Sequence, residues 1–451
     1  MTDRIHFIGV GGSGMSAVAR LTAATGVDVS GSDARESAYF LALKDAGMDV
    51  RVGHDPALVD GASAVVISTA VRESNPELAR ARELGIPVLH RSVALANALA
   101  GQRLIAVAGS HGKTTTSALT AHLLHACGID ASYAVGARVL GIEGAVAGGY
   151  AGTAGIGVVE ADESDGSFLR YDREVAILLN IEPDHLDHHG TVEALHAAFE
   201  EFASAAELVV ACLDDPVVRA MGERLSAAGH RVVTYGKSKD ADVRVTKTGV
   251  LVSGVAVPMT PTLPGTHQRL NAAAAWAAAV HLGADPGEAA DAVGTFGGTG
   301  RRYQLRGEVD GIRVIDDYAH HPTEVAALLA GAREAGTGHL VVLFQPALFS
   351  RTQLHASAFA EALSIGDADV VVSAVHGDRE DPIPGVDSHL IVDAAAMPEG
   401  STIALVPALE DAAQEAARLA KPGDTVLTVG SGTVTQAADW ILDALRMRAD
   451  G

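Results

Sequence analysis

Short apolar runs alternate with amphipathic stretches along the first part of the chain. Apolar runs bounded by glycine and polar residues are typical of buried strands, whereas apolar positions at helical spacing are typical of amphipathic helices. We expect strands over 4–10, 27–30, 49–52, 64–68 and 87–89, and helices over 15–25, 37–46 and 75–84. This alternation predicts a doubly wound α/β sheet with mostly parallel strands.

The same alternation continues to the C-terminus. The second set of expected strands is 104–108, 157–160, 175–180 and 208–211, with a helix over 115–127, and the third set is 313–316, 340–344, 370–373 and 425–429. A stretch rich in glycine and arginine at 297–302 separates these two sets. We therefore expect an α/β protein of three domains, 1–102, 103–302 and 303–451, which agrees with about 150 residues per domain. The first and third domains are expected to be Rossmann-like, and the second to be a parallel sheet of the P-loop ATPase type.

Composition and charge narrow the class of protein. Charged residues make up 20% of the chain and hydrophobic residues 48%, as in well-folded globular proteins. A formal net charge of −23, with no run of Lys or Arg, argues against nucleic-acid or membrane partners. Two cysteines, no signal-peptide pattern and no apolar run of about twenty residues favour a cytoplasmic protein. Anionic ligands must then meet local groups of positive charge.

A glycine-rich turn follows the expected strand 104–108 and opens a helix. The glycines let backbone N–H groups converge on a phosphate, Lys113 adds a positive charge, and Thr114 offers a hydroxyl to Mg²⁺. The turn has the short form G-x-x-G-K-T-T, because a standard P-loop has its first glycine at the position of Val107. We predict ATP binding by Gly109, Ser110, His111, Gly112, Lys113, Thr114 and Thr115.

A second glycine motif, at 9–14, follows the first expected strand and matches G-x-G-x-x-G. In a dinucleotide-binding fold such a turn meets a diphosphate, and an acidic residue about twenty positions later meets a ribose. Asp33 has that place, at the end of the second expected strand. The motif by itself leaves a nicotinamide-dependent dehydrogenase open.

Acidic residues follow the expected strand 157–160, at the edge where ligands bind in open parallel sheets. We interpret Glu160 as a Mg²⁺ ligand together with Thr114, because Mg²⁺ binds few carboxylates plus phosphate oxygens. The alternative is a solvated acidic loop. A group of His and Asp at 184–189 follows the next strand. His185 is the preferred metal ligand there, and the lack of cysteine disfavours structural zinc.

The third domain has a comparable cluster at 316–324, where a strand ends in acids and two histidines before a proline starts a helix. A carboxylate in this cluster could hold the ATP ribose, and His320 or His321 could contact phosphate or substrate. An N-cap with surface histidines is the alternative. Arg301 and Arg302 precede the cluster, and one of these guanidinium groups could swing onto a phosphate.

The order of these motifs resembles that of the Mur ligases, and the resemblance covers almost the whole chain. The segments that carry it are 9–16, 31–33, 109–115, 160–165, 180–185, 301–302, 316–324 and 344–346. The resemblance implies an N-terminal domain that holds UDP, a central domain that binds ATP, and a C-terminal domain that brings the amino acid and part of the ATP site.

The resemblance also implies roles for individual residues. The UDP-sugar contacts would be Gly11, Gly12, Ser13, Gly14, Met15, Ser16, Asp33, Ser68 and Thr69. The ATP contacts beyond the 109–115 turn would be Asn271, Arg302 and Asp317, and the amino-acid or substrate contacts His320, His321, Arg351 and Arg379. The catalytic residues would be Lys113, Glu160 and His185, and the metal ligands Thr114, Glu160 and His185.

Some positions depart from the family pattern. The first Asn expected near the adenine is Gln268, the His expected after Pro346 is Ala347, and the Tyr expected at 376 is His. The resemblance therefore fixes adenine contacts and amino-acid selectivity less firmly than the other roles. Residues 182–206 contain no Lys that could be carbamylated, which agrees with the alanine-adding branch of the family.

In that branch the implied reaction is ATP-dependent ligation of L-alanine to the lactyl carboxylate of UDP-N-acetylmuramate through an acyl phosphate. Mg²⁺, expected as two ions, would balance the phosphate charge, and domain closure would exclude water. The nearest alternative is a ligase that attaches a whole tripeptide to the same sugar nucleotide. A dehydrogenase and a non-enzymatic nucleotide switch are more distant alternatives. We expect a monomer or a homodimer.

Overall fold

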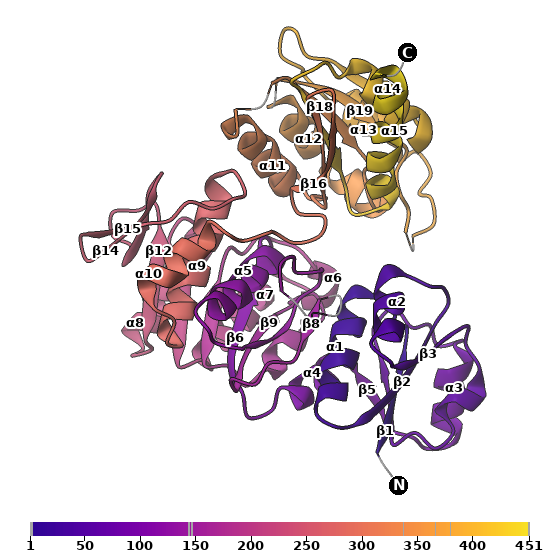
Figure 1. The fold of residues 1–451 in the computed structure, drawn as a ribbon, viewed down its shortest axis with the longest axis vertical. Coiled ribbons are helices and arrows are strands. Elements are labelled where there is room, and N and C mark those ends of the chain that lie inside the picture. The colour runs from indigo at the N-terminus through magenta and orange to yellow at the C-terminus, as the bar shows by residue number, and fades with distance from the viewer. Residues whose placement is uncertain are drawn as a thin grey trace. The chain divides into compact units, whose positions relative to one another are not determined.

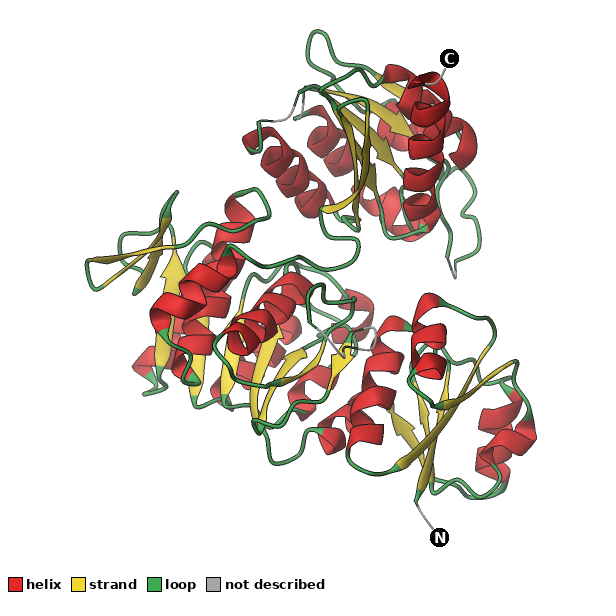
Figure 2. Cartoon of the chain, viewed as in Figure 1, coloured by secondary structure: helices red, strands yellow, loops and turns green. Residues whose placement is uncertain are grey.

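The computed structural model describes residues 3–142, 145, 148–336, 338–365, 367–378 and 380–449, without the side chain of Asp187. The chain forms two compact units, one of Met1–Thr262 with Arg269–Thr299 and one of Leu263–Gln268 with Gly300–Gly451. Helices and strands alternate throughout both units (Figure 1, Figure 2). The first unit contains two sheets and the second contains one, which confirms the expected α/β class with three sheets.

The first sheet has the strand order β3-β2-β1-β4-β5, and every neighbouring pair is parallel. Its strands are β1 (Arg4–Ile8), β2 (Asp28–Asp33), β3 (Asp49–Val52), β4 (Ala64–Ile67) and β5 (Val88–His90). Its helices are α1 (Ser13–Ala24), α2 (Ala38–Asp45), α3 (Pro76–Glu83) and α4 (Arg91–Ala98), with a 3-10 turn at Pro56–Val59. Helices α1 and α3 lie on opposite sides of the sheet (Figure 1).

The second sheet has the order β15-β14-β13-β12-β11-β10-β6-β9-β7-β8. Its strands are β6 (Arg103–Ala108), β7 (Ser132–Ala134), β8 (Gly149–Tyr150), β9 (Ile156–Glu160), β10 (Val175–Leu178), β11 (Leu208–Cys212), β12 (Val232–Gly236), β13 (Val243–Val245), β14 (Gly249–Val252) and β15 (Val255–Pro258). Its helices are α5 (Lys113–Ala126), α6 (Leu186–His189), α7 (Val192–Ser204), α8 (Pro216–Ala227), α9 (Thr266–His281) and α10 (Pro286–Val293), with a 3-10 turn at Ser167–Arg170. The strands from β13 to β7 pair in parallel, whereas β14, β15 and β8 pair antiparallel at the edges.

The third sheet has the order β16-β17-β21-β18-β19-β20, and only the edge pair β16–β17 is antiparallel among its described strands. Its strands are β16 (Gln304–Val309), β17 (Ile312–Asp317), β18 (Leu340–Phe344), β19 (Ala368–Val372), β20 (Ile403–Leu405) and β21 (Thr425–Val429). Its helices are α11 (Pro322–Glu334), α12 (Phe349–Ser364), α13 (His389–Val392), α14 (Leu409–Leu419) and α15 (Ala437–Ala449), with a 3-10 turn at Thr433–Gln436.

Both faces of the third sheet are buried, which explains why its strands are continuous apolar runs in the sequence. Along β18, Val342 packs into a core with α11 and α12, and its neighbours Val341 and Leu343 pack into a second core with α14 and α15. Figure 1 shows these two helix pairs on opposite sides of the sheet. No helix in the described ranges is long and apolar enough to cross a membrane.

Parallel pairing brings three loops to one edge of the second sheet. Strand β6 lies between β10 and β9, so the segments that follow Ala108, Leu178 and Glu160 leave the sheet side by side. These segments are the glycine turn, the 180–189 segment and the acidic run. Segments that are far apart in the sequence therefore meet where open parallel sheets bind ligands.

Some element ends differ from the expected ones because of glycine. Strand β1 ends at Ile8 rather than at residue 10, because Gly9 has φ +79 and starts the turn. Helix α5 begins at Lys113 rather than at residue 115, because Gly112 caps it with φ +88. The short strands β7 and β8 and the helix α4 were not expected.

Candidate active site

The turn between β6 and α5 requires its two glycines. Gly109 has φ +143 and Gly112 has φ +88, which L side chains rarely adopt. A Cβ at Gly109 would lie 2.9 Å from Leu179 Cβ and 3.0 Å from the Asn180 carbonyl oxygen. A Cβ at Gly112 would lie 2.9 Å from Asn271 Oδ1, so the predicted Asn271 is at the turn. The packed turn leads into the N-terminus of α5, where backbone N–H groups can bind an anion.

Side chains from the neighbouring strand end hold the turn in place. Asn180 Oδ1 accepts a hydrogen bond from the His111 N–H at 2.8 Å, and Asn180 Nδ2 donates to the His111 carbonyl at 3.0 Å. The Ser110 hydroxyl accepts the Glu182 N–H at 2.8 Å, and Thr115 is buried in the first turn of α5. These contacts fix the conformation of the turn without a bound ligand.

The Lys113 ammonium group is buried against the acidic run. Its Nζ donates to the Gly109 carbonyl at 2.6 Å and lies 2.8 Å from Glu163 Oε2. Burial alone would lower the pKa of Lys113, but the negative charge of Glu163 and of its acidic neighbours raises that pKa above its usual value. Lys113 is therefore charged at neutral pH, and a phosphate that binds it must compete with Glu163.

The structure brings Thr114 and Glu160 into contact. Thr114 Oγ1 donates to Glu160 Oε1 at 2.8 Å, and Glu160 Oε2 accepts the Gly136 N–H at 2.8 Å. A hydroxyl and a carboxylate are hard oxygen donors, which is the ligand type that Mg²⁺ prefers. The donor set therefore fits a magnesium ion shared with phosphate oxygens.

His185 lies on the 180–189 segment, where it is the N-terminal cap of α6 and has φ +54. Its Nε2 lies 3.6 Å from the carboxylate of its neighbour Asp184. His189, one turn along, donates from Nε2 to the Glu163 carbonyl at 2.9 Å. Among the described residues, no hydrogen bond or ion pair joins His185 to Glu160. The contacts place the 184–189 segment beside the acidic run, and the metal role of His185 stays a prediction.

A cleft of about 640 Å³ lies at the first sheet, within the range of about 300–1,000 Å³ that ligand pockets usually have. The predicted residues that line it are Gly12, Ser13, Gly14, Met15, Asp33 and Ser68. Gly11 ties the turn to Asp33, because its N–H donates to Asp33 Oδ2 at 2.9 Å. Ser16 is buried behind the turn, and Thr69 is exposed outside the lining.

His54 also lines this cleft, and the sequence analysis did not single it out. Its Nδ1 lies 3.3 Å from Oε1 of the fully buried Glu77 and 3.1 Å from the Ser32 hydroxyl. Glu77 Oε2 accepts the Ser32 hydroxyl at 2.6 Å and lies 3.1 Å from His6 Nε2. His54 lies two residues after the end of strand β3. A polar residue at the end of a parallel strand was the signal that could have revealed it.

Arg91 is a second lining residue that was missed, although it directly follows β5. A Cβ at Gly14 would lie 2.7 Å from Arg91 Nη1, so the last glycine of the motif makes room for the guanidinium group. Arg91 Nη2 donates to Asp162 Oδ2 at 3.1 Å. Burial would raise the pKa of Asp162, but Lys113 and Arg91, with hydrogen bonds from Ser164, lower it below its usual value. Arg91 thus links the glycine motif to the acidic run.

The remaining predicted residues lie in the second unit. Asp317 ends β17, and its two oxygens accept the N–H groups of Tyr303 and Ala319 at 2.7 and 2.8 Å. Burial raises the pKa of Asp317 to about 6 although Arg302 opposes the shift. The Arg302 guanidinium lies 5.1 Å from the centre of the Tyr318 ring. Both residues therefore belong to one ordered loop around the end of β17.

His320 and His321 lie between β17 and α11. His320 Nδ1 lies 3.2 Å from Glu324 Oε2. Burial lowers the pKa of His320 and, with the smaller effects of Arg351 and Arg302, outweighs the opposing charge of Glu324, so His320 is neutral at pH 7. Arg351 lies in the first turn of α12, and the predicted Arg379 lies outside the described residues.

The side chain of Arg301 is held by contacts within the second unit. Its Nη2 donates to the Gly430 carbonyl at 2.6 Å, its Nη1 donates to the Ser431 carbonyl at 3.2 Å, and its Nε lies 3.3 Å from Asp316 Oδ2. These bonds tie the start of the second unit to the turn after β21. Of the two adjacent arginines, Arg302 is therefore the one that we retain as a candidate phosphate contact.

Family models match most of the chain. The Mur ligase family catalytic-domain model matches residues 4–103, the Mur ligase middle-domain model matches 107–279, and the Mur ligase glutamate-ligase-domain model matches 301–432. The chain belongs to the Mur ligase family. This assignment explains why the glycine motif at 9–14 precedes a phosphate turn, and it replaces the dehydrogenase alternative.

Known members resemble this Mur ligase over its whole length. The UDP-N-acetylmuramate–L-alanine ligase of Renibacterium salmoninarum is 49% identical, covering 98% of this chain and 96% of that protein. The protein of the same name from Kineococcus radiotolerans is 48% identical, covering 99% and 97%. The crystal structure of the UDP-N-acetylmuramate-alanine ligase of Thermotoga maritima matches with a TM-score of 0.81 and 28% identity, covering 99% of this chain and 100% of that one. The murein peptide ligase of Psychrobacter arcticus matches with a TM-score of 0.69 and 25% identity, covering 98% of each chain.

Proposed function

We propose that this Mur ligase uses ATP to join L-alanine to the lactyl carboxylate of UDP-N-acetylmuramate. The observation that carries the proposal is the buried Lys113 beside the Thr114–Glu160 pair, on the same compact unit as a cleft of nucleotide size. A fixed cation and a magnesium site are what phosphoryl transfer requires. The two relatives that share 49% and 48% of its residues carry the name of this activity, which supports the choice of substrates.

In the first step, a lactyl carboxylate oxygen attacks the γ-phosphorus of ATP. A new P–O bond forms, the bond from the γ-phosphorus to the bridging oxygen breaks, and ADP leaves an acyl phosphate behind. Two like charges about 4 Å apart repel by roughly 4 kcal/mol at an effective dielectric constant near 20. Lys113 offsets that repulsion at the γ-phosphate. Thr114 and Glu160 would hold Mg²⁺, which neutralises phosphate oxygens when bound, and His185 is the proposed ligand of a second ion.

In the second step, the amine of L-alanine attacks the acyl carbon. The tetrahedral intermediate collapses, the C–O bond to the phosphoryl group breaks, and inorganic phosphate leaves an amide. The uncharged amine attacks and its nitrogen loses one proton as the amide forms, and the neutral His320 is the proposed acceptor of that proton. His321, Arg351 and Arg379 are the proposed contacts of the amino acid, and Arg302, Asp317 and Asn271 complete the proposed ATP site.

We place this reaction in the cytoplasm, because it consumes ATP and a nucleotide-linked sugar. The enzyme is proposed to act as a monomer or a homodimer, without a nucleic-acid or membrane partner. The net charge of −23 is consistent with this partner set.

A phosphate-release assay tests the proposal. Release is expected only with ATP, UDP-N-acetylmuramate and L-alanine together, and the product is an amide. Lys113→Ala is expected to reduce turnover at least about a hundredfold, because it removes a fixed charge from the transition state, while sugar-nucleotide binding is unchanged. Lys44→Ala, at an exposed lysine on α2, is the matched control and keeps full activity. Loss of both turnover and sugar-nucleotide binding in Lys113→Ala would contradict the assignment.

The recycling ligase that takes a whole tripeptide is the competing proposal. The 25% identity with the murein peptide ligase of Psychrobacter arcticus, against 49% with the alanine ligase of Renibacterium salmoninarum, favours L-alanine. The same assay with L-alanine and tripeptide as alternative cosubstrates separates the two. A higher kcat/KM for the tripeptide would replace our proposal by the recycling activity.

A further inference from the structure

A second, smaller cavity of about 120 Å³ lies within the first unit. Helices α1 and α4 contribute one wall, and the ends of β7 and β9 contribute another. Ser13 and Gly14 line it at the glycine motif, and Glu160 lines it at the proposed magnesium site. The cavity therefore lies between the place proposed for the diphosphate and the place proposed for the γ-phosphate. Neither the sequence motifs nor the proposed mechanism gives it a role.

Tyr171 lines this cavity directly after the 3-10 turn at Ser167–Arg170. The residue is only 6% exposed, and its hydroxyl has no hydrogen bond to any residue that the structure describes. Buried polar groups nearly always have a partner, because an unpaired one loses its hydration without compensation. The hydroxyl is not among the fully buried unpaired atoms, so its partner is water or a ligand in the cavity that it lines. Burial raises the pKa of Tyr171 well above its usual value, so the group is a neutral O–H donor at pH 7.

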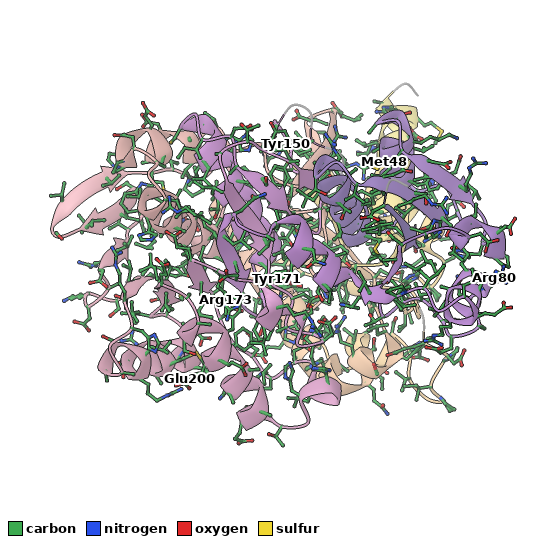
Figure 3. The ribbon with its side chains drawn as sticks, turned by 90° about the horizontal axis from the view of Figure 1, so that it is seen from below. Met48, Arg80, Tyr150, Tyr171, Arg173 and Glu200 are labelled. Atoms are coloured by element: carbon green, nitrogen blue, oxygen red, sulfur yellow. The ribbon has the colours of Figure 1, made fainter. Side chains whose placement is uncertain are left out.

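The backbone of Tyr171 is held firmly. Arg173 Nη1 donates to the Tyr171 carbonyl at 2.6 Å, and Arg173 Nε donates to the Phe202 carbonyl at 2.7 Å. The Arg173 guanidinium also lies 4.4 Å from the centre of the Phe202 ring. Figure 3 labels Tyr171 and Arg173 in this part of the first unit. An anchored tyrosine loses little further freedom when it binds a ligand, which favours a recognition role.

The charges around the cavity disfavour an anion. The charged lining residues are Arg91, Glu160 and Asp162, and Arg91 already donates to Asp162 at 3.1 Å. In the protein alone, two negative groups against one paired positive group leave no free side-chain cation for a phosphate or a carboxylate. The rest of the lining is largely apolar and includes Ala17, Val18, Leu95, Ala134 and Val135. The cavity therefore suits a neutral group that has one acceptor oxygen and a small apolar part.

The size of the cavity limits the occupant further. The cavity has a volume of about 120 Å³ and is partly open to solvent, so it suits a small substituent of a larger ligand. An acylamino substituent, with about four non-hydrogen atoms, is small enough to enter it. An acetamido group has one carbonyl oxygen and one methyl group, and these match the hydroxyl of Tyr171 and the apolar wall.

We propose that this cavity, through the Tyr171 hydroxyl, binds the N-acetyl group of the amino sugar, with the O–H donating to the acetyl carbonyl oxygen. The proposal rests on the proposed function, because it takes a UDP-linked N-acetyl amino sugar as the ligand of the first unit. It makes Tyr171 a specificity residue that distinguishes acylated amino sugars from plain hexoses.

Direct binding provides the first test, with calorimetry of UDP, UDP-glucose and UDP-N-acetylglucosamine as probes. The unsubstituted chain should bind UDP-N-acetylglucosamine more tightly than UDP-glucose. Tyr171→Phe should weaken the binding of UDP-N-acetylglucosamine by about two- to tenfold, which is the effect of losing one neutral hydrogen bond. The affinities for UDP and UDP-glucose should stay unchanged. Tyr133→Phe is the control, because Tyr133 is a buried tyrosine whose hydroxyl has no partner among the described residues and which does not line the cavity.

Steady-state kinetics with UDP-N-acetylmuramate provides the second test. Tyr171→Phe should raise KM for this substrate by the same factor, with KM for ATP and the free energy of unfolding unchanged, since the substitution removes no bond of the free protein. An unchanged preference for the N-acetyl sugar in Tyr171→Phe, an equal loss for all three UDP probes, or the same effect from Tyr133→Phe would overturn the proposal. A chain that binds the probes as expected but forms no amide would overturn the proposed reaction alone.

Discussion

Lys113 and Glu163 form an ion pair whose side chains are only 14% and 3% exposed. Removing the ammonium group alone would leave a buried carboxylate without its partner, which costs on the order of 3 kcal/mol. We expect Lys113→Met to lower the free energy of unfolding by that order, and the double variant Lys113→Met/Glu163→Gln to recover most of the loss. Urea unfolding of the two variants measures this difference. A double variant as unstable as the single one would show that the pair does not carry this stability.

Single residues differ in how well the sequence reveals them. Lys113 and Thr114 lie in a motif whose spacing follows from phosphate geometry, and Glu160 follows a long apolar run, so all three were found from the sequence. Arg91 and Tyr171 have no such spacing. An arginine after a short strand is usually a surface residue, and a lone tyrosine is usually part of a core, so their positions became informative only when the fold placed them at a cavity.

The connection of β6 to α5 is the element on which the proposed ATP site depends. Gly109→Ala puts a Cβ 2.9 Å from Leu179 Cβ at φ +143, whereas Gly128→Ala, at the other end of α5 with φ +73, meets no atom within 4 Å. Backbone strain costs each variant about 1–3 kcal/mol of stability. Only Gly109→Ala also displaces the turn, so it alone should raise KM for ATP, by tenfold or more. Equal KM values for the two variants would contradict this account of the turn.

The buried cluster of Glu77, His6, His54 and Ser32 joins α3 to the first sheet. Burial would raise the pKa of Glu77, but hydrogen bonds and the charges of His6 and His54 lower it below its usual value. A lowered pKa means that the carboxylate stabilises the fold above its unfolded-state pKa near 4.3, and that this contribution is lost as the pH falls through the lower folded-state pKa.

Glu77→Gln should therefore lower the free energy of unfolding at pH 7 by about 1–3 kcal/mol, the cost of a buried group with broken hydrogen bonds. The difference from the unsubstituted chain should start to shrink as the pH falls below the unfolded-state pKa near 4.3, and should vanish below the lower folded-state pKa, where both chains carry a neutral side chain. Glu83→Gln, at an exposed end of the same helix, serves as the control. Denaturant unfolding between pH 7 and pH 3.5 measures both. A difference that is independent of pH would contradict the role of the carboxylate charge.

At the scale of elements, the sequence revealed all five strands of the first sheet and β6, β9, β10, β11, β17, β18, β19 and β21 of the other two, but not β7, β8, β12 to β16 or β20. Strands β6, β10, β18 and β21 are buried on both faces, so each is an apolar run that a pattern can detect. Strands β7 and β8 are short, and their pairing is set by the tertiary fold rather than by periodicity. The antiparallel hairpin of β14 and β15 lies at an edge, where one side faces solvent and the apolar signal is weak.

The whole molecule consists of two compact units, each with its own hydrophobic core. Units with separate cores often unfold separately, so we expect two transitions in differential scanning calorimetry. The cleft that we propose binds the UDP-sugar lies entirely in the first unit. UDP-N-acetylmuramate at about 100 times its Kd should stabilise that unit by about 2.7 kcal/mol and move only one transition. A shift of both transitions by equal amounts, or a single transition, would show that the units unfold as one.

The space beside Gly14 is filled by the side chain of Arg91, because Arg91 Nη1 would lie 2.7 Å from a Cβ at that position. Any larger residue at 14 would push the guanidinium out of the two hollows that it borders. A larger residue at 14 is therefore expected to change the position of Arg91, whereas Gly14 accepts any side chain at 91. A library that randomises both positions and selects for cell growth should return the Gly–Arg combination far more often than the separate frequencies of glycine and arginine would give.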